Sequence, residues 1–345
     1  MYRKLLTIAS VLLVLQSCKK DDTAAKQPPV VYIAGSEEIA TPSFYSVAKL
    51  WTNGQATNLT TSNNYAEAYS VFVNGSDVYV AGYESQGQNN VAKLWKNGTA
   101  TNITNGTRDA QLASVFVSGS DVYVSGYESN GGYDVAKLWK NGVAITLAGG
   151  VNSDAYSAGV VVAGSDVYAL VQEYGAVNGI IKVWKNGTAT TISSANTDAY
   201  ANSIAVSGSD VYVAGGEQVG NTYKPFIWKN GQRIAINTTT GSTFAEAGFI
   251  AVSKNDVYVI LYESDSNNKD FYRVLKNGAV IATLSGATNA SVEAYSLFVS
   301  GNDVYVSGAE NTNGKWSPVY WKNNSIVRLA SSSGSNSHAY SLFVK

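Results

Sequence analysis

The sequence predicts an all-β fold made of seven repeated four-stranded units that close into a ring. Three observations lead to this prediction. The 345-residue chain is rich in Tyr, Gly, Asn, Ser and Thr and has no helical periodicity of useful length. A short motif returns along the whole chain at intervals of 44 to 47 residues. The chain ends with a strand-like segment that its first unit lacks.

Two sequence blocks mark the repeat. The tyrosine of the "DVY" block and the tryptophan before Asn-Gly each occur once per unit, with leucine replacing tryptophan in the sixth. The tyrosines are Tyr32, Tyr79, Tyr123, Tyr168, Tyr212, Tyr258 and Tyr305. The second block gives Trp51, Trp95, Trp139, Trp184, Trp228, Leu275 and Trp321. Both blocks count seven units, and we expect the tryptophans to pack between units.

The second unit shows the four expected strands in order. Residues 68–73, "AYSVFV", are apolar and β-branched, and the turn "NGSD" separates them from the second strand, 78–84. A polar loop leads to the third strand, 91–95. Asn97-Gly98 then predicts a tight hairpin into a fourth strand, 99–104. Four-stranded units of this length are typical of β-propeller blades.

The two ends of the chain predict how the ring closes. Residues 339–345 read as a first strand without a successor, and residues 30–36 read as a second strand without a predecessor. Pairing them antiparallel completes one blade and removes two exposed sheet edges. An open array of repeats would instead carry distinct capping units. We therefore expect residues 30–345 to form one seven-bladed β-propeller of four antiparallel strands per blade.

The blocks "DVYVAGYES" (77–85) and "VAKLWKNG" (91–98) resemble the bacterial seven-bladed propeller repeat. The resemblance extends over the whole predicted domain. It implies the propeller fold and little about activity, because propellers serve many functions.

The N-terminus predicts an export signal and a lipid anchor. Residues 1–17 have Arg3 and Lys4 before a short apolar run, and Leu15-Gln16-Ser17-Cys18 resembles a bacterial lipobox. The chain's single cysteine, Cys18, is therefore the expected lipidation site. Residues 18–29 are polar, end in proline and read as a flexible tether. The Cys-Lys-Lys-Asp-Asp start resembles Bacteroidetes-type lipoproteins, which implies a lipid-anchored protein of the outer membrane or cell surface.

Composition excludes several classes of protein. The net charge of −1 and scattered basic residues argue against nucleic-acid binding. One cysteine and one histidine allow no internal disulfide and no Cys/His zinc cluster. No phosphate loop or dinucleotide fingerprint is present, so we expect no cofactor. The expected partners are the membrane, through the lipid, and a glycan or protein ligand; the domain itself is expected to be monomeric.

The loops indicate which face binds. The "GSD" and "KNG" turns share one face and are nearly uniform, whereas the loops on the opposite face are longer and differ between blades. Aromatic residues in or beside these variable loops are the candidates for stacking on a sugar or gripping a peptide. They are Tyr45, Tyr133, Tyr174, Tyr223 and Trp316.

A glutamate ends the second strand of every blade and leaves two hypotheses open. The seven are Glu37, Glu84, Glu128, Glu173, Glu217, Glu263 and Glu310. They could form a carboxylate ring that attracts a cation at the channel mouth. Alternatively, each could pair with a base of its own blade. The third strand supplies Lys49, Lys93, Lys137, Lys182 and Arg273, while Lys224 and Lys315 would substitute in blades five and seven, where Phe226 and Val319 replace the base.

Three loop aspartates at the same offset, Asp109, Asp154 and Asp198, are weak candidates for calcium ligands. Loop aspartates more commonly accept hydrogen bonds within turns. We therefore expect no metal.

The sequence favours a non-catalytic binding module over two alternatives, a structural scaffold of the envelope and an enzyme with a carboxylate-lined channel mouth. His338 is the sole histidine, so a Ser/His/Asp triad would have to use it. The glutamates single out no catalytic pair of carboxylates. No catalytic residue is therefore predicted.

Overall fold

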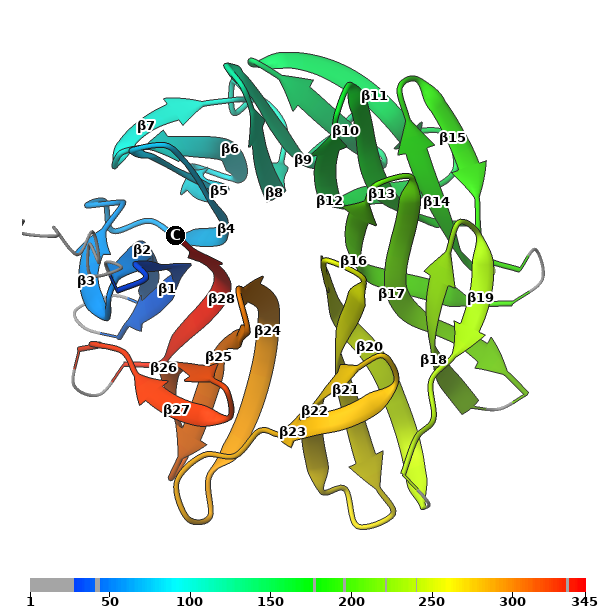
Figure 1. Cartoon of the computed structure of the whole chain (residues 1–345). Coiled ribbons are helices and arrows are strands. Elements are labelled where there is room, and N and C mark those ends of the chain that lie inside the picture. Colours follow the sequence, from blue (N-terminus) through cyan, green and yellow to red (C-terminus); the bar gives the residue numbers. More distant parts are fainter. Residues whose placement is uncertain are drawn as a thin grey trace, which may run out of the picture.

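The computed structural model describes residues 28–40, 44–175, 178–194, 197–220, 222–239, 241–332 and 335–345. Within these ranges every regular element is a β-strand. The 28 strands form seven four-stranded antiparallel sheets arranged as blades around a central axis (Figure 1). The predicted seven-bladed β-propeller is therefore confirmed. The expected signal peptide, Cys18 and most of the tether lie outside the described residues.

The strands occupy equivalent places in each blade, from the axis outwards. The innermost strands are β28 (Ser337–Val344), β4 (Ala66–Asn74), β8 (Ala110–Ser118), β12 (Asp154–Ala163), β16 (Ala199–Ser207), β20 (Ser242–Ser253) and β24 (Ser291–Ser300). The second strands are β1 (Val31–Ile39), β5 (Asp77–Gln86), β9 (Asp121–Ser129), β13 (Asp166–Tyr174), β17 (Asp210–Val219), β21 (Asp256–Asp265) and β25 (Asp303–Thr312).

The outer half of each blade follows the same pattern. The third strands are β2 (Tyr45–Thr52), β6 (Asn89–Lys96), β10 (Asp134–Lys140), β14 (Gly179–Lys185), β18 (Thr222–Lys229), β22 (Asp270–Lys276) and β26 (Lys315–Lys322). The outermost strands are β3 (Gln55–Asn58), β7 (Thr99–Asn102), β11 (Val143–Gly149), β15 (Thr188–Thr191), β19 (Gln232–Ala235), β23 (Ala279–Thr283) and β27 (Ser325–Arg328).

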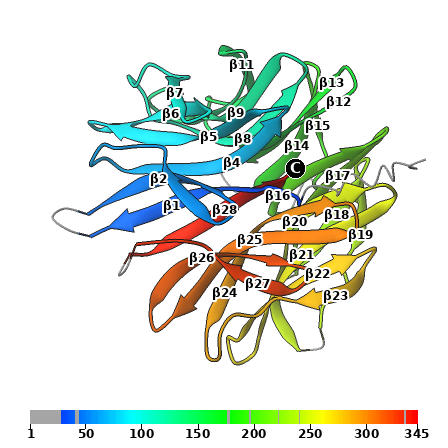
Figure 2. The same ribbon diagram turned by 60° about the vertical axis from the view of Figure 1, so that its left-hand side comes forward.

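The two ends of the chain close the ring. Strand β28 pairs antiparallel with β1, with Val344 opposite Val31 and Leu342 opposite Ile33. Figures 1 and 2 both show β28 beside β1, in the sheet that also holds β2 and β3. Backbone hydrogen bonds between Val30 and Lys345 extend the pairing, at 2.8 and 3.0 Å. The predicted pairing of the C-terminal and N-terminal strands is confirmed.

The hydrophobic core lies between neighbouring blades. Trp95 of blade two, counting the β28–β1–β2–β3 sheet as blade one, packs with Ala34 and Ala48 of blade one. Trp139 of blade three packs with Tyr79 and Ala81 of blade two. All six tryptophans of the repeat are at most 7% exposed, which confirms the expectation that they pack between blades.

Each inner strand carries a β-bulge near the axis, and the neighbouring strand makes room for it. In blade two the register shifts between Ala68 and Ser70. Gly82 lies opposite, and a Cβ there would come within 1.9 Å of the Glu67 carbonyl oxygen. Glycine is therefore required at this point because the two backbones approach too closely for a side chain.

Leucine in place of tryptophan leaves a cavity between blades five and six. Leu275 lines an apolar pocket of about 330 Å³ together with Ile227, Ile236 and Val259. The next interface keeps its tryptophan, Trp321, and has a smaller pocket of about 230 Å³. The Trp321 indole donates to the Ser285 carbonyl at 2.9 Å, a hydrogen bond that leucine cannot make.

Replacing Leu275 with tryptophan should fill the larger cavity and raise the free energy of unfolding by about 1 kcal/mol. The matched change Trp321→Leu should lower it by about 2 kcal/mol or more, because it opens a cavity and removes the indole hydrogen bond. Denaturant unfolding of both variants measures the effect. A destabilised Leu275→Trp variant would show that the cavity cannot accept an indole.

Candidate functional site

The turn face, formed by the "GSD" and "KNG" turns, is built from one repeated polar cluster. In blade two, Asn97 adopts φ 51°, accepts a hydrogen bond from Val78 N–H and donates to Asp77. Lys96 pairs with the same aspartate at 2.7 Å and lies 5.3 Å from the centre of the Tyr79 ring. Blades three to seven repeat the Lys–Asp pair, at 2.7 to 2.8 Å. Such uniformity indicates a structural role for this face.

The opposite face, which we call the loop face, carries the exposed aromatic side chains. Within the described residues, the most exposed phenylalanine and tyrosine side chains all lie there. They are Phe44, Tyr65, Tyr133, Tyr174 and Phe244, with exposed fractions of 36 to 53%. Variable loops on a rigid scaffold are where binding specificity usually resides.

The seven second-strand glutamates each form an ion pair with a base of their own blade. The pairs are Glu37–Lys49, Glu84–Lys93, Glu128–Lys137, Glu173–Lys182, Glu217–Arg233, Glu263–Arg273 and Glu310–Arg328. The glutamate side chains are 0 to 20% exposed. Their charge is therefore compensated within each blade, in agreement with the ion-pair hypothesis.

The bases in blades five and seven differ from the prediction. Arg233 and Arg328 of the outermost strands take the place expected for Lys224 and Lys315. In both blades the third strand has an apolar residue where the other blades have a base, and an arginine from the outermost strand reaches the glutamate instead. The Arg233 guanidinium stacks 4.2 Å from the centre of the Phe226 ring, and Arg328 lies directly opposite Val319. Lys315 instead contacts the Ser332 carbonyl at 3.4 Å.

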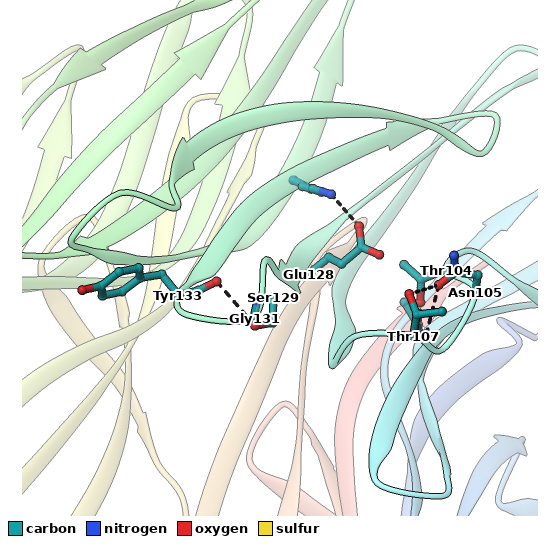
Figure 3. Close-up of polar contacts among 9 residues, drawn as sticks. Thr104, Asn105, Thr107, Glu128, Ser129, Gly131 and Tyr133 are labelled. Carbon is teal, nitrogen blue, oxygen red and sulfur yellow. Dashed lines mark hydrogen bonds and ion pairs between the residues drawn. The ribbon is translucent and has the colours of Figure 1, made fainter.

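These glutamates also hold the loops that cross from one blade to the next. Glu217 accepts hydrogen bonds from Ser194 N–H at 2.8 Å and from the Thr197 hydroxyl at 2.6 Å. Glu173 accepts one from Ser153 at 3.1 Å. Burial alone would raise the pKa of Glu217, but Ser194, Thr197 and Arg233 hold that pKa below its usual value. In Figure 3, Glu128 lies near the Thr104–Thr107 crossing loop, while the Tyr133 ring points away from it.

The three loop aspartates also hold these loops in place by accepting hydrogen bonds from the preceding blade. Asp109, Asp154 and Asp198 accept the N–H of Asn90, Asp134 and Gly179, respectively, at 2.6 to 2.8 Å. Each donor lies at the start of the preceding blade's third strand. In the described part of the chain, no three His, Cys, Asp or Glu residues come close enough to hold one metal ion.

The predicted aromatic candidates lie in five different blades. Tyr133 and Tyr174 are exposed, whereas Tyr45, Tyr223 and Trp316 are half-buried. Tyr223 donates a hydrogen bond to Asp198 and lies 5.6 Å from the Tyr200 ring. Trp316 packs 5.7 Å from His338. The structure therefore places these residues around the loop face and does not gather them into one cluster.

A belt of aromatic rings around the channel mouth was not predicted. Neighbouring ring centres lie 5.0 to 6.4 Å apart in three arcs. The arcs are Tyr83–Tyr69–Tyr340 with His338, Tyr295 and Trp316; Tyr127–Tyr156–Tyr174; and Tyr200–Tyr223–Phe244–Tyr262–Tyr272. The sequence feature that could have predicted this belt is the tyrosine of the "AYS" segments, which recurs in several inner strands.

Three inner-strand carboxylates accompany this belt. Tyr69 donates to Glu67, and Tyr295 donates to Glu293. Glu246 instead accepts a hydrogen bond from the Asn202 side-chain amide at 2.5 Å. Burial raises the pKa of both Glu67 and Glu246. Burial lowers the pKa of His338, whose Nδ1 lies 3.1 Å from the Tyr295 hydroxyl.

The seven inner strands enclose a small polar space on the axis of the ring. Residues from all seven inner strands line a space of about 150 Å³ there. Five serine hydroxyls accept the N–H of the next blade's inner strand at 3.1 to 3.4 Å; they are Ser70, Ser114, Ser203, Ser296 and Ser341. This space is smaller than the pockets that hold drug-sized ligands.

Comparison with known proteins confirms the fold only. No protein-family profile and no curated protein sequence matches the chain. A puromycin-hydrolysing peptidase of Mycobacterium tuberculosis superposes with a TM-score of 0.56 at 10% identity. The superposition covers 87% of this chain and 52% of the peptidase, so the chain spans about half the length of that protein.

Two further structures share a weaker likeness. A triple arginine-to-alanine mutant of AofleA from Arthrobotrys oligospora has a TM-score of 0.46 at 13% identity, covering 79% of this chain and 89% of that one. TolB from Acinetobacter baumannii has a TM-score of 0.45 at 14% identity, covering 72% and 65%. The class defined by fold and geometry is a β-propeller with a uniform turn face and a varied, aromatic loop face.

The buried Glu84–Lys93 pair should stabilise the fold more than the exposed Lys96–Asp77 pair. Lys93→Met leaves a largely buried carboxylate without its base and should lower the free energy of unfolding at pH 7 by about 2 kcal/mol, allowing for partial solvent screening. Lys96→Met is the control and should change little, because Lys96 is 52% exposed. Denaturant unfolding at pH 7 measures both variants.

The effect of Lys93→Met should fade in acid. Burial raises the pKa of Glu84, but the hydrogen bonds from Lys93 and Ser62 outweigh burial and hold this pKa below 4.5 in the folded protein. The pair therefore stabilises the fold above the unfolded pKa, and this contribution is lost as pH falls through the folded pKa. A penalty that stayed constant from pH 7 to well below the folded pKa would contradict the assignment.

Proposed function

We propose that this protein is a non-catalytic binding module of the cell envelope that takes a glycan on its loop face. The observation that carries the proposal is the location of the exposed aromatic side chains, all of which, among the described residues, lie on that face. An aromatic ring offers a flat apolar surface to the C–H face of a sugar, and a nearby hydroxyl or carboxylate can bind the sugar's hydroxyls.

The arrangement of polar groups supports a glycan as the ligand. Tyrosine hydroxyls hydrogen-bonded to carboxylates recur around the loop face, as in Tyr127–Asp109 at 3.0 Å and Tyr156–Asp134 at 2.9 Å. Paired groups of this kind are held in fixed orientations, which lowers the entropic cost of binding a polar ligand. Loops braced by the second-strand glutamates would keep the aromatic rings in place.

Attachment to the envelope through a lipid on Cys18 is the second part of the proposal. It rests on the lipobox-like sequence that precedes this cysteine and on the polar segment that follows it. Among the described residues, no helix has the length and apolarity needed to cross a membrane.

Screening the protein on a glycan array tests the ligand. Tyr133→Ala and Tyr174→Ala should each weaken binding to any hit by about tenfold, because loss of one aromatic contact costs on the order of 1 kcal/mol. The turn-face variant Lys140→Ala is the matched control and should bind normally. The array could give no hits while the protein captures a partner protein from envelope extract, and this capture could depend on Tyr133 and Tyr174. That result would contradict the glycan proposal and identify the ligand as a protein.

Replacing Cys18 with serine should move the protein from the membrane fraction to the soluble fraction, because the thioether-linked lipid can no longer form. Fractionation followed by immunoblotting measures the distribution, with the unchanged chain as reference. Retention of Cys18→Ser in the membrane fraction would argue against the lipid anchor.

A further inference from the structure

A pocket beside the channel mouth arises where one blade departs from the repeat. At the inner-strand bulge, β4 reads Glu67-Ala68-Tyr69 and β24 reads Glu293-Ala294-Tyr295, whereas β20 reads Glu246-Ala247-Gly248. In the first two strands, the tyrosine hydroxyl donates to the glutamate two residues before it. Blade six has no side chain at this place, so the cap on its glutamate is missing.

The space left by the missing tyrosine is open. A pocket of about 260 Å³ lies beside Glu246 and Gly248, and the rings of Phe249, Tyr262, Tyr272 and Tyr295 form part of its wall. A Cβ on Gly248 would meet no atom nearer than the Ile260 carbonyl oxygen, at 3.7 Å. The glycine is therefore not required by a close backbone contact, in contrast to Gly82.

The carboxylate in this pocket lacks a compensating base. The Asn202 amide donates a hydrogen bond to Glu246 Oε1 at 2.5 Å, and no lysine, arginine or histidine lines the pocket. All seven second-strand glutamates, in contrast, are paired with a lysine or arginine. Glu246 is thus a half-buried carboxylate whose charge is balanced by no cation in the described part of the chain.

The walls favour one kind of cation. The Tyr262 and Tyr272 ring centres lie 5.0 Å apart, and a third ring, Tyr295, borders the same space. Aromatic faces attract a diffuse positive charge, and cages of such rings bind methylated ammonium groups. A primary ammonium would need three hydrogen-bond acceptors, whereas the side chains lining this pocket offer mainly one carboxylate and aromatic surface.

We propose that the pocket bounded by Glu246, Gly248, Tyr262, Tyr272 and Tyr295 binds a methylated ammonium group. The carboxylate supplies the opposite charge and the tyrosine faces surround the methyl groups. This site is separate from the loop-face aromatics Tyr133 and Tyr174, so it does not depend on glycan binding. Burial raises the pKa of Glu246, and a bound cation would oppose that effect by favouring the ionised form.

Calorimetric titration of the purified full chain with choline tests the proposal. We expect a dissociation constant on the order of 1 mM, as is reasonable for so small a ligand. The neutral isostere 3,3-dimethyl-1-butanol and the primary amine n-butylammonium should each bind at least about tenfold more weakly. Equal binding of the neutral isostere would reduce the site to an apolar pocket, and tighter binding of n-butylammonium would exclude a preference for methylated ammonium; either result overturns the proposal.

Two substitutions locate the site. Glu246→Gln should weaken choline binding about tenfold or more by removing the charge at nearly constant shape. Gly248→Tyr should abolish binding, because the new phenol would cap Glu246 as Tyr69 caps Glu67. The matched controls are Gly248→Ala and Glu67→Gln, which should bind choline within about twofold of the original protein.

Thermal unfolding of each variant separates loss of binding from loss of fold. A Gly248→Tyr variant that unfolds at or above the temperature of the original protein while binding no choline supports the proposal, and one that keeps its choline affinity while folded overturns it. If Gly248→Tyr unfolds below the temperature of the original protein, the choline affinity of Glu246→Gln alone tests the proposal. Unchanged choline affinity in a folded Glu246→Gln variant, or an equal loss in Glu67→Gln, overturns the proposal.

Discussion

The pairing of β28 with β1 is the constraint on which the rest of the structure depends. These strands lie about 300 residues apart in the chain, and their register joins Val31 to Val344 and Glu37 to Ser337. Closure removes the two free sheet edges that an open row of blades would expose. It also directs all seven inner strands toward one axis, so that the loops of every blade share one face.

Ring closure alone would leave the crossing loops free, and the second-strand glutamates restrain them. Each glutamate joins a base of its own blade, and several also bind hydroxyl or N–H groups of the loop arriving from the blade before. The aspartates at the end of those loops bind back to the preceding blade. The two faces therefore differ in kind: the turn face repeats one polar cluster, while the loop face holds varied side chains on a braced framework.

Departures from the repeat account for the distinctive local features. Leu275 replaces a tryptophan and leaves the larger of two inter-blade cavities. Phe226 and Val319 replace a base, and an arginine from the neighbouring strand takes over its role. Gly248 replaces a bulge tyrosine and leaves a carboxylate in an aromatic pocket. In a duplicated architecture the shared residues maintain the fold, so chemistry specific to one place arises where a blade differs.

The sequence alone determined the blade count, the strand order within a blade, the closing pair of strands and the separation into two faces. These follow from strand alternation and Asn-Gly turns within each unit, and from the recurrence of that unit along the whole chain. Only the tertiary structure decided which base reaches Glu217 and Glu310, because Arg233 and Arg328 act across strands from positions that the repeat does not mark. It alone also brought the inner-strand tyrosines and Glu246 to the channel mouth, since their neighbours come from other blades. Contacts between blades depend on which side chains the closed ring brings together, and the pattern of residues along one blade does not contain that information.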